Sequence, residues 1–200
     1  MAKLSLNKAT LHKESAKLKR YKQYLPSLDL KRQQLMTERA KAQSALVQLQ
    51  QDVQACQDWV AASLPMLANR HIAVQNLVKV EQIEVKRENV VGVNLPKLST
   101  LKISREQYSF FVKPHWVDRL VVELERMLLL QIQLRVQQQR LTILNMAVKK
   151  VTQKVNLFDK VLIPKSLHNI RKIRLSLSDA ERADVVRAKT TKQLRSQQAI

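Results

Sequence analysis

An apolar residue recurs at almost every seventh position through the first third of this chain. One row of the repeat consists of Leu4, Leu11, Leu18, Leu25, Leu46, Val53, Val60, Leu67 and Val74. A second row, three residues further on, consists of Tyr21, Leu28, Leu35, Ala42, Leu49, Cys56 and Leu77. Arg32 and Arg39 interrupt the first row. Rows that alternate at three and four residues form one narrow apolar stripe along a helix, and a second helix has to cover that stripe.

The same repeat returns after Pro114, in the last part of the chain. Its rows consist of Leu120, Met127, Leu134, Leu141, Val148, Val155 and Leu162, joined by Leu130, Leu144, Val151 and Phe158. Pro164 is expected to bend this second helical arm, because proline cannot continue the helical hydrogen bonding. Beyond it a narrower apolar face continues with Leu167, Ile170, Ile173 and Leu177.

Two helical arms of this kind predict a mainly α fold. They can fold back on each other as a long antiparallel two-helix coiled coil, or each arm can pair in parallel with its copy in a second chain. The intrachain coiled coil is favoured because both stripes lie on one polypeptide and need no second copy. In that arrangement the first and last residues of the chain lie together at one end.

Residues 80–114 follow a different pattern. Residues 80–85 alternate in part, residues 90–96 are β-branched and contain the only glycine, and residues 108–112 include three aromatic side chains. With Pro96 and Pro114 as breaks, we expect a small β-hairpin or irregular region here. The chain is thus expected to consist of an N-terminal coiled-coil arm (1–79), a middle region (80–114) and a C-terminal coiled-coil arm (115–200).

Local signals predict the limits of the first helix. Asn7 or Thr10 can cap its start, because both side chains accept hydrogen bonds from backbone N–H groups. Pro26 and Pro65 lie inside the repeat, and the repeat keeps its register across both. Each proline therefore predicts a kink rather than a helix end, and the helix is expected to run to about Leu77.

The charge of the chain is strongly positive and unevenly distributed. There are 36 Lys and Arg residues against 16 Asp and Glu, which gives a net charge of +20. Residues 1–50 hold 11 basic and three acidic side chains, residues 151–200 hold 11 and four, and residues 51–100 hold five of each. A coiled coil that joins the two ends has one basic end, which suits an acidic partner.

Cysteine usage and hydropathy predict a cytoplasmic location. Cys56 is the only cysteine, so the chain can form no internal disulfide, which fits a reducing compartment. We expect it to be a small buried residue of the stripe rather than a nucleophile. The N-terminus lacks the pattern of a secretory signal, and no stretch reaches the ~18 apolar residues that a membrane span needs.

No catalytic, cofactor or metal site is expected. The four histidines, His12, His71, His115 and His168, are scattered without cysteines or carboxylates at metal-ligand spacing. A glycine-rich phosphate loop is excluded because Gly92 is the only glycine.

Several segments, in this order, resemble the D subunit family of V-type and A-type rotary ATPases. Residues 10–11 and 28–35 are similar to its N-terminal Thr-Leu and Lys-Arg stretches, and residues 89–96 to its central segment of glycine, apolar residues and proline. Residues 154–159, Ile163-Pro164, Ile170, Ile173, Glu181-Arg182 and Lys189 are similar to its C-terminal part. Ala9 stands where the family usually has proline, and Leu157-Phe158-Asp159 replaces Ala-Leu-Glu.

The resemblance implies a non-catalytic rotor shaft, present once in the complex. In that family the coiled coil enters a hexameric head of alternating A and B subunits. The hairpin end meets a small F subunit and the socket subunit that docks on the membrane ring. The shaft couples ATP hydrolysis or synthesis to proton or sodium ion transport and binds no nucleotide. Such a chain is peripheral on the cytoplasmic face of the membrane and touches the membrane only indirectly.

Two sets of residues are the candidates for partner binding. At the basic end they are Lys13, Lys17, Lys19, Arg20, Lys22, Arg171, Lys172, Arg174 and Arg187. Exposed ion pairs are weak and can exchange as a shaft turns, which suits this end to a sleeve with acidic loops. For the hairpin and its joint they are Val90, Val93, Leu95, Tyr108, Phe110 and Phe111, because fixed interfaces favour apolar and aromatic anchors.

The alternative interpretation is a basic coiled-coil scaffold that binds nucleic acid or an anionic membrane. The sequence shows no interleaved aromatic platform, zinc-ligand spacing or helix-turn-helix signature beside the charge, so nucleic acid is not the favoured partner. Binding of either kind would weaken steeply with salt.

Overall fold

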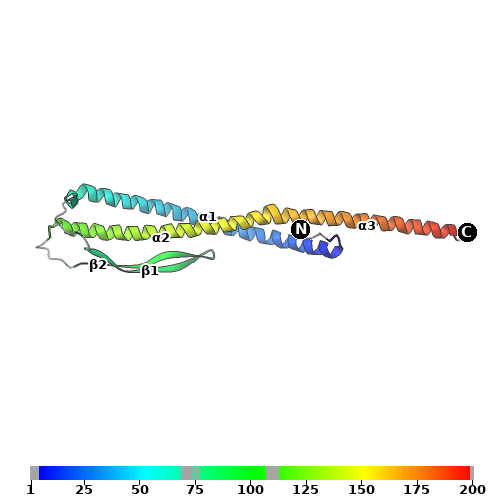
Figure 1. The fold of residues 1–200 in the computed structure, drawn as a ribbon, viewed down its shortest axis with the longest axis horizontal. Coiled ribbons are helices and arrows are strands. Elements are labelled where there is room, and N and C mark those ends of the chain that lie inside the picture. Colours follow the sequence, from blue (N-terminus) through cyan, green and yellow to red (C-terminus); the bar gives the residue numbers. More distant parts are fainter. Residues whose placement is uncertain (1–4, 69–73, 75–76, 107–112, 199–200) are drawn as a thin grey trace. The chain divides into compact units, whose positions relative to one another are not determined.

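The computed structural model describes residues 5–68, 74, 77–106 and 113–198. The elements follow in the order α1 (Lys8–Ser63), η1 (Pro65–Ala68), β1 (Val78–Val90), β2 (Val93–Arg105), α2 (Trp116–Leu157), η2 (Phe158–Leu162) and α3 (Ile163–Gln198), shown in Figure 1. The fold is mainly helical, with a β-hairpin between the helical arms. This confirms the fold class that the sequence predicted.

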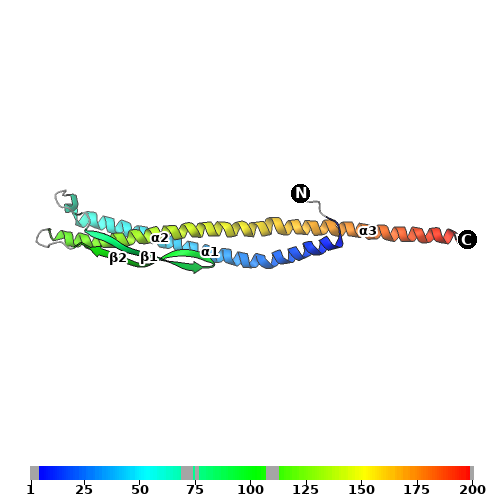
Figure 2. The same ribbon diagram turned by 60° about the horizontal axis from the view of Figure 1, so that its bottom comes forward.

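The chain divides into two compact units. The terminal unit consists of Met1–Arg32 and Lys150–Ile200, and the hairpin unit consists of Gln33–Lys149. In the terminal unit the first turns of α1 run beside α3 (Figure 2). The rings of Tyr21 and Phe158 meet edge to face there, with centroids 5.4 Å apart. The first turns of α1 therefore pack against η2 and the first part of α3, where Ile170 and Ile173 are buried, as the antiparallel arrangement requires, whereas residues 179–195 are exposed.

The predicted stripe is the core of the hairpin unit. Leu35, Ala42, Leu46, Val53 and Cys56 of α1 are buried, and so are Leu130, Leu144 and Val148 of α2. Gln137 Nε2 donates a hydrogen bond to the carbonyl of Ala42 (3.1 Å), and Cys56 Sγ lies 3.6 Å from Glu123 Oε2. Numbers on α1 rise as those on α2 fall, so the two helices are antiparallel.

The start of α1 is as predicted and its end is not. Asn7 caps the helix, because its Oδ1 accepts a hydrogen bond from the backbone N–H of Thr10 (2.7 Å). Pro26 lies inside α1, which continues through it. The expectation that the helix also passes Pro65 and runs to Leu77 is wrong, because α1 ends at Ser63 and Pro65 opens the short 3₁₀ turn η1. The proline ring disfavours the helical conformation of the residue before it and has no N–H to donate.

Pro164 is accommodated by a π-helical turn. The backbone N–H of Ile163 donates to the carbonyl of Phe158, five residues earlier, and η2 spans the intervening turn. Proline leaves a carbonyl of the preceding turn without its usual donor, and a π turn is one of the known ways in which a helix adapts to such a gap. The helical path therefore continues from α2 into α3.

The hairpin is longer than the sequence indicated. β1 pairs antiparallel with β2 from Val78 opposite Arg105 to Val90 opposite Val93, with irregularities between Val80 and Gln82 and between Glu84 and Val85. Residues 90–96, the β-branched segment with the only glycine, span the end of β1, the turn and the start of β2. Pro96 lies within β2, opposite Arg87, rather than at a break.

The turn of the hairpin contains an unfavourable backbone conformation. Val91 and Gly92 connect the strands, and both have positive φ, 53° and 75°. A two-residue turn with positive φ at both positions matches the right-handed twist of the strands. Gly92 adopts it without cost and its N–H donates to Asn89 Oδ1 (2.9 Å). Val91 is β-branched, so this conformation is a genuine outlier.

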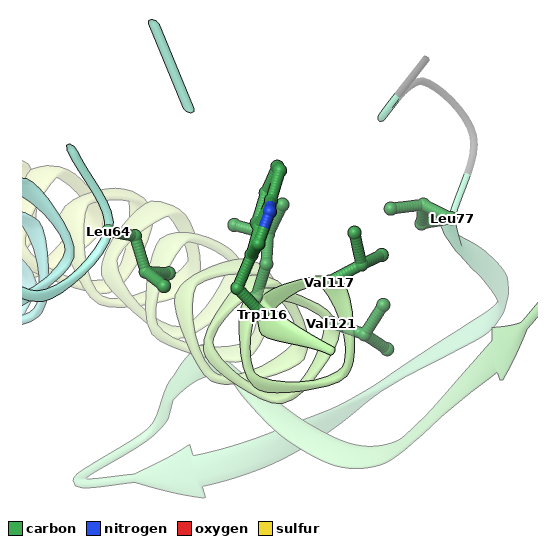
Figure 3. Close-up of a cluster of buried hydrophobic side chains, with 6 residues drawn as sticks. Leu64, Leu77, Trp116, Val117 and Val121 are labelled. Carbon is green, nitrogen blue, oxygen red and sulfur yellow. The ribbon is translucent and has the colours of Figure 1, made fainter. Parts of the chain in front are cut away.

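A second apolar cluster fastens the base of the hairpin to the helices. It contains Leu64, Leu77, Trp116, Val117, Leu120 and Val121. Figure 3 shows Leu77, Val117 and Val121 on one side of Trp116 and Leu64 on the other. The backbone N–H of Glu106 donates to the carbonyl of Leu77 (3.0 Å), which closes the base of the hairpin.

Replacing Val91 by asparagine should stabilise the hairpin. Asparagine tolerates positive φ, and Asn-Gly is the preferred pair for such a turn. We expect Val91→Asn to gain about 1 kcal/mol, seen as slower hydrogen exchange of the hairpin amides. Val91→Ala is the control, because alanine keeps a Cβ in the unfavourable region. Equal exchange in Val91→Asn and the unchanged chain would show that the turn is not strained.

Candidate partner-binding surfaces

The positive charge is concentrated in the terminal unit. Its residues hold 21 Lys and Arg against six Asp and Glu, whereas the hairpin unit holds 15 and ten. All nine basic residues predicted to bind a partner belong to this unit, on α1 and α3. All nine are also exposed. The structure thus places the basic segments of α1 and α3 in one unit, although Arg187 lies on the exposed part of α3 that continues past the start of α1 (Figure 1).

Two of these nine basic residues form ion pairs within their own helix. Lys17 Nζ lies 2.8 Å from Glu14 Oε1, and Arg187 Nη1 lies 3.2 Å from Asp184 Oδ1. The Arg187–Asp184 pair is exposed, and pairs of this type contribute a few tenths of a kcal/mol at most, so Arg187 can still meet an external carboxylate. The Lys17 pair differs, because its partner Glu14 is only 7 % exposed.

The far end of α3 has no covering helix within the terminal unit. From Asp179 to Arg195 every described side chain is exposed, including Val185 (55 %) and Val186 (62 %). In Figure 1 this part of α3 continues past the beginning of α1. Most helical stability in proteins comes from packing of an apolar face, so a helix of this length is stabilised when a partner surrounds it.

One strand of the hairpin carries exposed apolar side chains. Val80, Ile83 and Val85 of β1 are exposed, while the residues that pair with them on β2 are half buried. These three valine and isoleucine residues were not among the candidates predicted from the sequence. The partial alternation of residues 80–85 indicated a strand on which Ile83 and Val85 share one face, but it showed neither the irregularity between Val80 and Gln82 nor which face stays exposed.

The predicted joint residues differ in their exposure. Val90 and Val93 flank the turn and are half buried, whereas Leu95 is completely buried (0 % exposed). Leu95 therefore anchors the hairpin from inside. Tyr108, Phe110 and Phe111 lie outside the described residues.

Ion pairs to Arg140 and Glu125 hold the hairpin against α2, and one further pair joins β1 to β2. Near the turn, Glu88 lies 3.0 Å from Arg140 Nη1 and 3.8 Å from Lys97 Nζ. Near the base, Arg105 forms a two-point ion pair with Glu125, with Nη2 donating to Oε2 at 2.7 Å. The Arg140 hydrogen bond lowers the pKa of Glu88, and the Arg105 hydrogen bonds lower the pKa of Glu125. Both carboxylates are charged at neutral pH.

Cys56 lines an apolar pocket of about 400 Å³ between the end of α1 and the start of α2. Its thiol donates to the carboxylate of Glu123, and burial, followed by this carboxylate, raises the pKa of the thiol. A protonated thiol is a poor nucleophile. The residue is buried in the stripe, as predicted from its position in the repeat.

No group of three or more His, Cys, Asp or Glu side chains that could hold a metal ion occurs among the described residues. The helices that the structure describes include none that is both long enough and apolar enough to cross a membrane.

The sequence of the chain was compared with profiles of known protein families, and one of them matches. The family profile described as the D subunit of ATP synthase matches residues 10–193. The chain belongs to the ATP synthase D subunit family.

The family relatives align with this chain over nearly their whole length. The V-type ATP synthase D subunit of Borreliella burgdorferi is 29 % identical over 96 % of this chain and 95 % of the relative. The proteins of the same name from Chlamydia felis and Chlamydia caviae are 32 % and 30 % identical, over 96 % of this chain and 93 % of each relative. As a member of this family, the chain is a non-catalytic central-stalk subunit of a V-type rotary ATPase.

Acidification should loosen the hairpin of this stalk subunit. Because the pKa values of Glu88 and Glu125 are lowered in the folded chain, their contribution to stability is present above the ordinary carboxyl range. It is lost as the pH falls through the lowered values. We expect the hydrogen-exchange protection factors of the hairpin amides, corrected for intrinsic rates, to fall between about pH 5 and pH 3.

The control for this experiment is Glu88→Gln combined with Glu125→Gln. It should show lower protection at neutral pH and little further change on acidification. Protection in the unchanged chain that stays constant over this range would contradict the role given to the ion pairs.

Proposed function

We propose that this chain is the rotating shaft that couples the nucleotide-binding head of the ATPase to the ion-transporting membrane ring. The terminal unit occupies the hexameric head of A and B subunits, and the hairpin unit forms the joint with the small F subunit and the socket subunit. The observation that carries the proposal is the gathering of 21 basic side chains in the unit that also bears the uncovered end of α3.

The chemistry of the terminal unit suits a surface that must turn inside a sleeve. A rotating shaft cannot be held by deep packing at every angle, because such packing would fix one angle. Exposed ion pairs contribute only ~0.2–1 kcal/mol each and can be exchanged for others along the path. Long-range attraction between a basic shaft and acidic loops of the sleeve still keeps the two together.

The hairpin unit offers the opposite kind of surface. Val80, Ile83 and Val85 are apolar and exposed on a hairpin that Leu95 and the Arg105–Glu125 pair hold in place. Apolar side chains on a fixed support favour a joint that does not slide, because burying them removes water and gives a definite geometry. This supports placing the joint with the F and socket subunits at the hairpin unit.

Subunit counting in the isolated complex tests the proposal most directly. We expect purification of the tagged chain at moderate salt to recover one copy of it with three copies each of two large nucleotide-binding chains, measured by native mass spectrometry. Recovery of nucleic acid or lipid vesicles in place of these chains would favour the alternative of a basic scaffold.

Charge reversal on α3 should weaken binding to the head. The variant carries Arg171→Glu, Lys172→Glu and Arg174→Glu, which are exposed in the terminal unit. We expect an affinity for the A–B head that is lower by about tenfold or more at low salt, with a smaller difference at high salt. The matched control reverses the exposed Lys86, Arg135 and Lys149 of the hairpin unit and should bind the head normally. Equal affinities for the two variants would contradict the proposed orientation.

Polar substitution on β1 should weaken the joint while leaving the fold intact. Val80→Ser, Ile83→Ser and Val85→Ser remove exposed apolar surface, so circular dichroism should show an unchanged helix content. Co-purification with the F and socket subunits should fall several-fold. Val185→Ser with Val186→Ser, at the free end of α3, is the control and should keep both subunits. Loss of both subunits in the control but not in the β1 variant would reverse the assignment of the two units.

A further inference from the structure

In the terminal unit the apolar stripes of α1 and α3 face each other and form a seam. One polar layer interrupts this seam. Glu14 is 7 % exposed and Ser166 is 4 % exposed, and these are the two buried polar or charged residues in the described part of the chain. Asn169 lies three residues after Ser166, on the same face of α3. Above and below this layer the seam is apolar, with Leu18 on α1 and Ile170 and Ile173 on α3.

The layer joins the two helices through side chains. Asn169 Nδ2 donates a hydrogen bond to Glu14 Oε2 (3.3 Å), and Lys17 Nζ donates to Glu14 Oε1 (2.8 Å). Each carboxylate oxygen of Glu14 therefore has a donor, one from its own helix and one from the partner helix. The Lys17 hydrogen bond lowers the pKa of Glu14 against the opposing effect of burial, so the buried group is an anion.

An apolar seven-residue repeat does not by itself select one register. Leu11, Leu18 and Leu25 are identical residues spaced seven apart, so a shift of one helix by seven residues exchanges one leucine for another. A shift that brings Leu162 opposite Glu14 removes the amide of Asn169 and leaves a buried carboxylate with half of its donors, whereas the opposite shift replaces the amide with the shorter hydroxyl side chain of Ser176. Leaving a buried charge without its partner is strongly unfavourable, whereas an apolar contact is easily replaced.

The layer also opposes pairing between two copies of the chain. In a parallel dimer, Glu14 would face Glu14 of the second copy inside the seam. Two buried carboxylates at such a position repel each other and cannot supply donors to each other. Single polar residues at core positions of coiled coils are known to specify register and partner in this way, at some cost in stability.

We propose that Glu14 and Asn169 are positioning residues that select the register and the intrachain pairing of the terminal unit. The register determines how far α3 extends past the start of α1. A shift of seven residues would change that length by ~10 Å. If the terminal unit occupies the head as proposed above, this pair sets how deeply the free end of α3 can reach into it. The register itself does not depend on that function.

Spin-label distances in the isolated full-length chain test the inference. Labels at Ala9→Cys and Ala188→Cys, both exposed and both in the terminal unit, are placed in a Cys56→Ala background. The distance between them runs largely along the helix axis, so it reports the register. We expect one narrow distance population in the unchanged seam. Glu14→Leu with Asn169→Leu should keep or raise the melting temperature but add a population displaced by ~10 Å, or a dimer.

A rescue variant separates positioning from simple stability. In Glu14→Gln with Asn169→Asp, the glutamine oxygen can still accept from Lys17 and its amide can donate to the new carboxylate. This pair should restore the single narrow population. His12→Leu with His168→Leu adds two leucines at exposed neighbouring positions and should change nothing. A single unshifted population and a monomer in the double-leucine variant would overturn the inference, whatever the outcome of the head-binding experiments.

Discussion

The mutual covering of two narrow apolar stripes is the interaction on which the rest of the structure depends. A single helix leaves its apolar stripe exposed to water, which is unfavourable, so each stripe has to be covered by another helix. Leu35 and Leu144, both completely buried, show that in the hairpin unit each helix supplies what the other lacks. Because the seam uses only about two positions in seven, the remaining positions are left to water or to partners. A chain built in this way can carry a large net charge without placing it in the core.

The two units use that freedom differently. In the terminal unit most of the charged side chains are basic, and every described side chain from Asp179 to Arg195 on α3 is exposed. In the hairpin unit the excess of basic over acidic side chains is smaller, 15 against ten, and β1 presents apolar side chains on a support fixed by Leu95 and by ion pairs to α2. In the proposed function, the terminal unit attracts its partner without fixing an angle, and the hairpin unit offers a definite shape. This contrast is what a shaft needs if it is to turn in one partner and be fastened to another.

The prolines of the helical arms show where the helices depart from regular α-helical geometry. Pro26 lies within α1, whereas α1 ends at Ser63 and Pro65 opens the short turn η1. At Pro164 the seam continues on α3, with Ile170 and Ile173 buried, and a π turn before the proline keeps the helix going.

The sequence by itself determined the features of this protein that follow from residue spacing and composition. The rows of the repeat, the Asn7 cap, the hairpin in the middle and the basic ends follow from spacing and composition, because side chains on a regular helix repeat in a way that can be counted. Glu14 could have been found in the same way, since it lies seven residues before Tyr21 in the second row. The tertiary structure alone decided that Glu14 meets Asn169, that Leu95 is an internal anchor and that Val80, Ile83 and Val85 stay exposed. These depend on which distant segment lies opposite each residue, and a local pattern does not contain that information.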